Sequence, residues 1–191
     1  MTGYEEIKAL YATLPRIKCK GLCHDQCRGI YLTPAENKEI RRRKGAGIPT
    51  PDQARNAANR GTGINQLGLK TNPIDRSKVT CPLLDRITKR CTAYEVRPFI
   101  CRAWGVTERM VCPHDCEIEG TPLTFKQEAQ LTVTVQHLGD PRFTQEEYAR
   151  EMAILEDPEM LAIREQYARQ QISEHTYFKQ VDAWRKEHGY T

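Results

Sequence analysis

The sequence predicts a mainly α protein, with a small irregular cysteine-cluster metal-binding domain of loops and short helices followed by a helical C-terminal region. All eight cysteines of the 191 residues lie between positions 19 and 116. Thr followed three residues later by Glu or Gln, a signature of helix starts, recurs along the chain. Beyond position 120, apolar side chains recur at helical spacing. We expect a cysteine-cluster domain over residues 1–120 and a helical extension packed on it over 121–191.

The N-terminal part of the chain should contain three helices. A Thr-x-x-Glu signature at its start predicts a first helix over residues 3–13. A second begins at Thr33-Pro34-Ala35-Glu36, where Thr can cap and Pro suits the first helical position, and it ends at Lys44 before a glycine. A third, almost entirely polar helix is expected over residues 51–60. The stretch 61–80 is rich in Gly, Asn, Thr and Pro and predicts a loop.

The C-terminal part should contain four helices. Thr124 and Gln127 predict a helix that ends at Gly139, although the alternation of residues 131–135 is typical of a strand. Aromatic and apolar side chains aligned on the later helices predict core packing and not cofactor contacts. These later helices are expected to begin at Thr144, Pro158 and Ser173.

Composition and cysteine usage indicate a cytoplasmic protein without a membrane segment. No apolar run approaches the roughly 18 residues of a membrane span. The first ten residues, MTGYEEIKAL, carry acidic side chains where a secretory signal would be basic. Disulfides are rare in the reducing cytosol, so metal binding explains eight cysteines better than a disulfide framework does. Because the count is even, the disulfide framework stays an alternative.

Charge is distributed unevenly along the chain. Residues 1–120 carry 21 Lys and Arg against 13 Asp and Glu, whereas residues 121–191 carry 8 against 12. The positive excess either offsets the negative charge of metal-bound thiolates or forms a surface for nucleic acid or an acidic partner. The densest basic run suits the C-terminal end of a helix, where cations are stabilised, and phosphate contact is its alternative role. This run is Arg41, Arg42, Arg43 and Lys44.

The cysteines form a constellation of soft metal ligands. Thiolate sulfur suits zinc and iron–sulfur clusters and does not suit magnesium or calcium. A continuous helix would separate Cys19 and Cys27 by roughly 12 Å, too far for one zinc ion. This segment therefore either loops around one centre, or Cys27 serves a different one. The candidate metal ligands are Cys19, Cys23, Cys27, Cys81, Cys91, Cys101, Cys112 and Cys116.

The ligand inventory leaves the cofactor open between zinc and an iron–sulfur cluster. Eight thiolates could fill two four-cysteine zinc sites, or one iron–sulfur cluster with four cysteines remaining. Proline after Cys81 and Cys112 favours the iron–sulfur alternative. Histidines beside the cysteines could replace a ligand, or donate hydrogen bonds near it. Arginines beside Cys101 could bond to sulfur, pair with carboxylates or hold the loop's shape. The aromatic rings of Tyr94, Phe99 and Trp104 are expected to pack around the site and shield it from water. The candidates for these supporting roles are His24, His114, Arg97, Arg102 and Tyr94.

One string of residues resembles a known family. Cys-Pro-Leu-Leu at 81–84, the string Cys-Thr-Ala-Tyr-Glu-Val-Arg-Pro-Phe-Ile-Cys-Arg at 91–102, and the upstream Cys-x₃-Cys-x₃-Cys resemble the YkgJ-like cysteine-cluster family. That family is described as a zinc- or iron-chelating domain. The resemblance covers residues 19–116 and implies that the eight cysteines are metal-site residues. The family's first motif usually ends in a Cys-Cys pair, whereas here Arg28 follows Cys27.

Three functions are compatible with this inventory. The first is a closed, structural metal centre that supports binding to a protein partner. The second is an iron–sulfur-dependent enzyme for redox chemistry or group transfer, although the sequence has no convincing nucleotide-binding loop. The third is a zinc-stabilised nucleic-acid-binding protein that uses the basic N-terminal part. The sequence favours the first of these.

Overall fold

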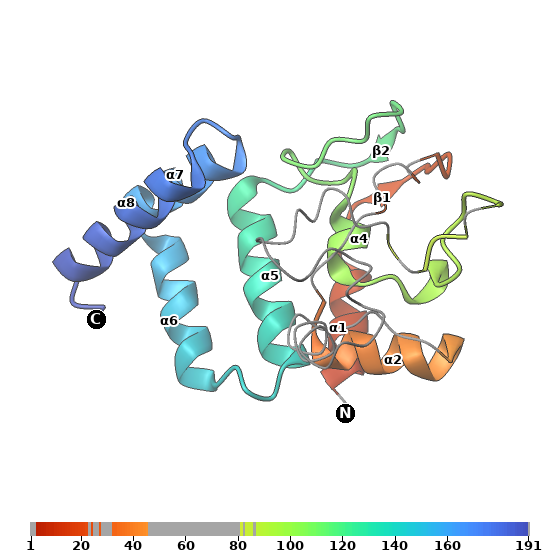
Figure 1. Cartoon of the computed structure of the whole chain (residues 1–191), viewed down its shortest axis with the longest axis horizontal. Coiled ribbons are helices and arrows are strands. Elements are labelled where there is room, and N and C mark those ends of the chain that lie inside the picture. The colour runs from red at the N-terminus through yellow and green to blue at the C-terminus, as the bar shows by residue number, and fades with distance from the viewer. Residues whose placement is uncertain are drawn as a thin grey trace, which may run out of the picture.

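The computed structural model describes residues 3–22, 24, 27, 32–45, 81, 83–85 and 87–190. The helix predicted over residues 51–60 and the loop predicted over 61–80 lie outside the described residues. The fold is mainly helical, as the sequence predicts, with a single two-stranded sheet among the described residues. In Figure 1, the cysteine-bearing loops lie at one end of the molecule and the C-terminal helices at the other.

Two N-terminal helices confirm the predictions from helix-start signatures. Helix α1 spans Gly3–Tyr11 and helix α2 spans Pro34–Lys44. The Thr33 side chain accepts a hydrogen bond from the Glu36 backbone, and the Glu36 carboxylate bonds back to the Thr33 backbone. This capping box fixes where α2 begins. Gly45 ends the helix at φ 70°, a left-handed conformation that favours glycine.

The cysteine-bearing segments have little regular structure. Strand β1 (Arg16–Ile17) pairs antiparallel with strand β2 (Ile118–Glu119). Between them in sequence lie the short 3₁₀ helix η4 (Tyr94–Val96) and helix α4 (Phe99–Ala103). This part of the chain therefore gains few backbone hydrogen bonds from secondary structure.

Helix α5 (Phe125–Gly139) settles the ambiguity of residues 131–135 in favour of a helix. Thr124 and Gln127 form the predicted capping box. The Thr132 and Thr134 hydroxyls donate to the backbone carbonyls four residues earlier, which lets these β-branched polar residues sit inside a helix.

The last three helices confirm the predicted starts. They are α6 (Gln145–Glu156), α7 (Pro158–Ala168) and α8 (Glu174–Glu187). Each has a side-chain N-cap, provided in turn by Thr144, Asp157 and Ser173. The predicted aromatic and apolar stripes on α7 and α8 form a core that contains Ile163, Tyr177, Val181 and Trp184.

Helix α5 lies between the cysteine-bearing half and the C-terminal helices (Figure 1). Its Val135 is buried in one cluster with Ile7 of α1 and Phe99 of α4. On its opposite side, helix α5 packs against helix α6. Residues on both sides of position 120 thus share a core, and the division into two domains stays a prediction. No helix in the described part of the chain is long and apolar enough to cross a membrane.

Candidate metal centre

Four cysteines gather around helix α4 and form what we call the inner thiol group: Cys27, Cys81, Cys91 and Cys101. Cys101 lies on α4, and the charges of the other three sulfurs act on it. The Cys81 backbone N–H donates to the Cys27 carbonyl over 2.9 Å, which joins two segments far apart in sequence. Cys91 is held by an isolated β-bridge to Leu84.

The inner thiol group is the less accessible part of the constellation. Cys81 is buried, and Cys27 and Cys91 pack against a small apolar cluster that includes Leu83 and Val96. Burial raises the pKa of Cys101 to about 12; Cys81, Cys91 and Cys27 add to the rise, and the Arg97 guanidinium opposes it. Burial also raises the pKa of Cys81. A cation that replaces the thiol protons would relieve this cost of charge.

Three further cysteines lie at the ends of the two strands and form the outer thiol group: Cys19, Cys112 and Cys116. The Cys112 and Cys116 thiols each shift the pKa of the other, and the charge of Cys19 raises the pKa of Cys116. The Lys20 backbone N–H donates to the Cys116 sulfur over 3.4 Å. The Lys20 ammonium bonds to the His114 carbonyl over 2.9 Å, so positive charge lies beside this group.

The pKa values of the paired outer thiols move apart. Burial acts to raise the pKa of Cys112, but hydrogen bonds from the His114 and Cys116 backbones, the Cys116 thiol and the charge of Lys20 bring it below its usual value. For Cys116, the bond from the Lys20 backbone lowers the pKa, yet burial and the neighbouring thiols outweigh it, and the pKa is raised. The turn over residues 112–116 thus makes Cys112 easier to deprotonate than Cys116.

The structure separates cysteines that are close in sequence. Cys19 belongs to the outer group and Cys27 to the inner one, which supports the alternative that Cys27 serves a different centre. Residues 19–22 are not helical. Cys23 lies outside the described residues.

Neither thiol group has its sulfurs arranged as the coordination shell of one metal ion. Among the described residues, no three His, Cys, Asp or Glu side chains are arranged to hold one metal ion as they stand. Rotation of a cysteine between staggered χ1 wells moves its sulfur by about 3 Å without any backbone change. The donor set itself, with only sulfur in either group, fits zinc or iron and does not fit a hard cation.

Two predicted supporting residues, His24 and His114, contribute through their backbones. The His24 carbonyl accepts a hydrogen bond from the Cys27 N–H over 3.1 Å. The His114 carbonyl accepts a hydrogen bond from the Lys20 ammonium over 2.9 Å, and the His114 backbone lowers the pKa of the Cys112 thiol. Each histidine thus helps to place a cysteine whether or not its ring binds metal.

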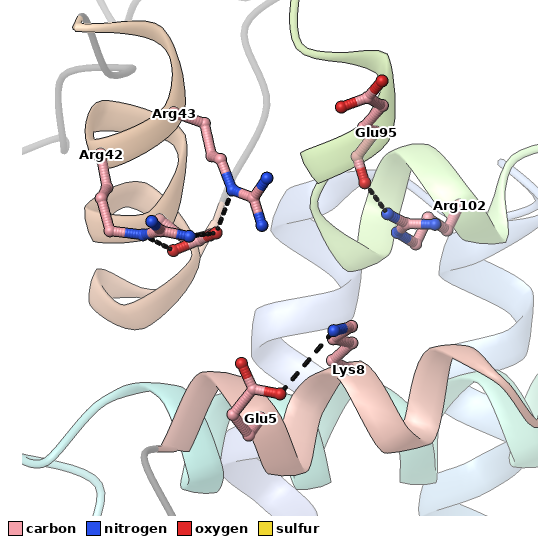
Figure 2. A network of polar contacts seen from close by, with 7 residues as sticks. Glu5, Lys8, Arg42, Arg43, Glu95 and Arg102 are labelled. Atoms are coloured by element: carbon pink, nitrogen blue, oxygen red, sulfur yellow. Dashed lines mark hydrogen bonds and ion pairs between the residues drawn. The ribbon is translucent and has the colours of Figure 1, made fainter.

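The arginines beside Cys101 bond to backbone carbonyls, which is the arrangement expected if they hold the shape of the loop. The Arg97 Nε donates to the Tyr94 carbonyl, and its guanidinium lies 3.6 Å from the centre of the Tyr94 ring. Arg102 donates to the Arg97 and Glu95 carbonyls; Figure 2 shows the bond to Glu95. These bonds hold the turn that leads into α4.

The expected aromatic shield is only partly formed. Phe99 is buried, and Trp104 packs against the same cluster. Tyr94 is 47% exposed and covers the Arg97 guanidinium. The Tyr94 ring therefore covers the Arg97 guanidinium more than it shields the cysteine sulfurs from water.

Glu36 is a supporting residue that the sequence identified only as a cap. Its carboxylate is buried and accepts hydrogen bonds from the Thr33 backbone and hydroxyl, from Tyr11 and from the Phe99 N–H. Phe99 is the first residue of α4, so one carboxylate joins α1, α2 and the helix that carries Cys101. The capping signature predicts the bonds to Thr33; nothing local to the sequence predicts the other two.

The basic run at the end of α2 is partly neutralised. Arg42 and Arg43 bond to the Glu39 carboxylate over 2.7 and 2.9 Å (Figure 2). The pKa of Glu39 is lowered to about 2, chiefly by the hydrogen bond from Arg42. Burial acts to raise this pKa, and the hydrogen bond from Arg43 lowers it further. Arg43 also lines a cleft of about 480 Å³ between α1, α2 and η4, together with Lys8 and Arg102.

Comparison with known proteins gives one match. A family model named CxxCxxCC, described as "Putative zinc- or iron-chelating domain", matches residues 18–117, which is more than half of the chain. No curated protein and no solved structure matches the chain. The matched range begins just before Cys19 and ends just after Cys116, so it encloses both thiol groups.

Proposed function

Because the chain belongs to the CxxCxxCC family of zinc- or iron-chelating domains, we propose that its inner thiol group holds a structural metal centre. The proposed ligands are Cys27, Cys81, Cys91 and Cys101. The observation that carries the proposal is the mutual approach of four thiols from four separate places in the chain around α4. Soft donors brought together in this way suit zinc or iron.

A structural role follows from what this part of the chain lacks. The described residues from Cys81 to Ala103, which carry three of the four cysteines, form one isolated bridge, one 3₁₀ turn and a five-residue helix. The apolar cluster beside these cysteines is small: Leu32, Ile40, Leu83, Ala93 and Val96 with Cys81. When bound, zinc or iron supplies the cross-link between the sulfurs that packing alone does not provide.

The closed character of the centre argues against a primary role in catalysis. Every proposed ligand is a protein thiolate, as in structural metal sites, whereas catalytic sites keep a position open for water or substrate. Cys81 is buried and Cys101 is half-buried, which limits access of a substrate.

A protein partner is the second part of the proposal. Large apolar side chains are exposed on the loops that carry the cysteines: Leu22 is 49% exposed, Ile87 92% and Val111 67%. A contiguous apolar patch favours contact with another protein surface, and these three side chains are the proposed members of such a patch. The basic run favours nucleic acid less, because Glu39 engages two of its arginines.

Metal analysis of anaerobically purified protein tests the proposal. Tightly held zinc in a colourless protein, or iron with visible sulfur-to-metal absorption, would each support a thiolate centre and would identify its metal. The matched variant, Cys81→Ser with Cys91→Ser, should lose that metal. Protein that retains no metal and in which all eight thiols react freely with a thiol reagent would contradict the proposal.

A further inference from the structure

We propose that the cleft bordered by α1, α2, η4 and α4 binds a small phosphomonoester, and that Lys8, Arg43 and Arg102 are the cations that receive its phosphate group. Each cation comes from a different helix. The cleft has a volume of about 480 Å³, which is the size of a small-molecule site. The described residues that line it include no cysteine. Binding in this cleft is therefore a separate property from metal binding by the thiols.

The three cations project into one space. In Figure 2 the Lys8 ammonium extends from α1, the terminal nitrogens of Arg43 extend from α2, and Arg102 lies opposite on α4. All three line the same cleft, so their nearness in this view reflects their positions in the fold. Like charges that converge from separate elements repel one another, and a bound anion offsets that repulsion.

The guanidinium group of Arg43 is only partly engaged by Glu39. The Arg43 Nε donates to Glu39 Oε1 over 2.9 Å, whereas Arg42 bonds to both oxygens of the same carboxylate over 2.7 Å. One carboxylate thus faces two guanidinium groups, which leaves an excess of positive charge. Among the described residues, the terminal nitrogens of Arg43 have no hydrogen-bond partner. They present the paired donors that bind a phosphate in bidentate fashion.

The charge of Arg102 is held in place without being neutralised by a described carboxylate. Its Nε and Nη2 donate to the backbone carbonyls of Arg97 and Glu95. Figure 2 shows the Glu95 carboxylate directed away from this guanidinium. The guanidinium carbon lies 4.5 Å from the centre of the Tyr11 ring. Arg102 is therefore a fixed cation at the wall of the cleft.

The Tyr4 hydroxyl is an unused donor beside these charges. Burial raises the pKa of Tyr4, and the charges of Arg102 and Arg43 oppose that rise. The carboxylates of Glu39 and Glu36 add to it. The hydroxyl has no hydrogen-bond partner in the part of the chain that the structure describes. It is placed to donate to an oxygen of an anion that lies between the two arginines.

The balance of charge in the cleft favours a dianion. The Lys8 ammonium lies 3.8 Å from the Glu5 carboxylate, so these two charges offset each other in part. The positive excess is therefore carried by Arg43 and Arg102. A phosphomonoester carries a charge of about −1.5 to −2 at pH 7 and matches two guanidinium groups. A carboxylate or a phosphodiester carries a single negative charge and matches only one.

The remaining lining favours a compact ligand. Carboxylates in the lining would repel the further phosphates of a nucleic-acid strand; they belong to Glu5, Glu39 and Glu95. The organic part of a small ester finds apolar surface on Ala12 and Val96 of the same cleft. The ligand should therefore carry one phosphate group on a small organic body.

Isothermal titration calorimetry of the full chain, purified anaerobically, tests the proposed site with phenyl phosphate as the probe. The parent chain should bind one phenyl phosphate with a Kd of about 1 mM or tighter. Arg43→Gln should weaken binding by at least about tenfold, because it removes charge-assisted hydrogen bonds. Arg42→Gln is the matched control, since Arg42 bonds to the same Glu39 but is not among the residues that line the cleft. It should change the Kd by less than about threefold.

Two further comparisons keep the test decisive. Tyr4→Phe removes only the hydroxyl and should weaken binding by about threefold or more, with the helical circular dichroism spectrum retained. Benzoate, which has the same ring but a single negative charge, should bind at least about tenfold more weakly than phenyl phosphate.

Three results would overturn the assignment of the cleft. They are absence of saturable phenyl phosphate binding, equal weakening by Arg42→Gln and Arg43→Gln, and benzoate binding as tight as that of phenyl phosphate. A single-stranded oligonucleotide without terminal phosphates that displaces phenyl phosphate at lower concentration would assign the cleft to nucleic acid instead. Each of these results leaves metal binding by the thiols unaffected.

Discussion

Cys101 is the residue on which the inner centre depends most. Cys101 lies on α4, and burial raises the pKa of its thiol. The charges of three other cysteines raise this pKa further. Arg97, beside it in the fold, lowers the energy of the anion. A side chain placed in this way contributes most when a cation takes the place of its proton.

Cys101→Ser should remove metal from the inner thiol group and lower the free energy of unfolding by more than about 3 kcal/mol, because metal binding and folding are coupled here. Elemental analysis and urea denaturation measure the two effects. Cys19→Ser is the control, since this cysteine is exposed and belongs to the other group. A Cys101→Ser protein with full metal content and unchanged stability would rule out the assigned role.

Glu36→Gln should cost about 2–3 kcal/mol of stability, because the carboxylate accepts four hydrogen bonds in a buried position and an amide cannot accept all of them. Urea denaturation of metal-loaded protein gives the difference. Glu39→Gln on the same helix is the matched control and should cost less than about 1 kcal/mol, because its arginine partners are largely exposed. Equal costs at the two positions would contradict a special role for Glu36.

The cost of Glu39→Gln should depend on pH. The pKa of Glu39 is lowered from 4.5 to about 2, so the ionised carboxylate stabilises the fold above pH 4.5, and this contribution is lost as the pH falls toward 2. The difference in stability between parent and variant should therefore shrink across that interval, as far as both stay folded. Urea denaturation from pH 7 to pH 3 measures it. A difference that grows on acidification would have the wrong sign.

At the scale of elements, Gly105 lies where the end of α4 meets Ile17 of β1 and Cys112. It has φ 84°, and a Cβ placed there would lie 2.7 Å from the Ile17 side chain and 3.3 Å from that of Cys112. The helix that carries the inner cysteine and the turn that carries the outer ones therefore meet at one glycine. A Cβ at this point would force the end of the Ile17 side chain to move and the Cys112 Cβ to shift by a few tenths of an ångström.

Gly105→Ala should destabilise the protein by about 2–4 kcal/mol, the sum of left-handed backbone strain and the close contact. Gly120→Ala is the matched control, because Gly120 also has positive φ but open space where its Cβ would be. The control should cost about 1 kcal/mol. Thermal or urea denaturation measures the loss of stability in both variants. Equal losses in Gly120→Ala and Gly105→Ala would show that the contact of residue 105 with Ile17 and Cys112 contributes nothing.

The elements that the sequence predicts well are those fixed by neighbouring residues. Thr33 with Glu36 and Thr124 with Gln127 set helix starts through bonds three residues apart, so α2 and α5 follow from local chemistry. The grouping of the cysteines is different. It depends on the pairing of Ile17 with Ile118 and on the bond between Cys81 and Cys27, and no local pattern encodes either contact.

At the scale of the whole molecule, the chain has separate cores at its two ends. One apolar cluster lies beside the inner thiols, whereas another, with Trp184 at its centre, lies between α7 and α8. Helix α5 separates them, as Figure 1 shows. The C-terminal helices also have capped ends and stacked aromatic rings that require no metal. The two ends should therefore respond differently to removal of metal.

Metal removal should increase hydrogen exchange of residues 83–104 by at least tenfold and leave α7 and α8 nearly unchanged, because only the former depend on the proposed cross-link. Exchange followed by mass spectrometry, with and without a chelator, resolves the two regions. The C-terminal helices serve as the internal control. A uniform increase along the whole chain would indicate a single cooperative unit and would contradict this division.

X-ray absorption at the metal edge of anaerobically purified, full-length protein tests the central claim most directly, because it reports the atoms bound to the metal without requiring any variant. An all-thiolate protein should give a shell of sulfur neighbours at about 2.3 Å, for zinc and for iron alike. A shell dominated by nitrogen or oxygen at about 2.0–2.1 Å would contradict the assignment of the cysteines as the metal ligands.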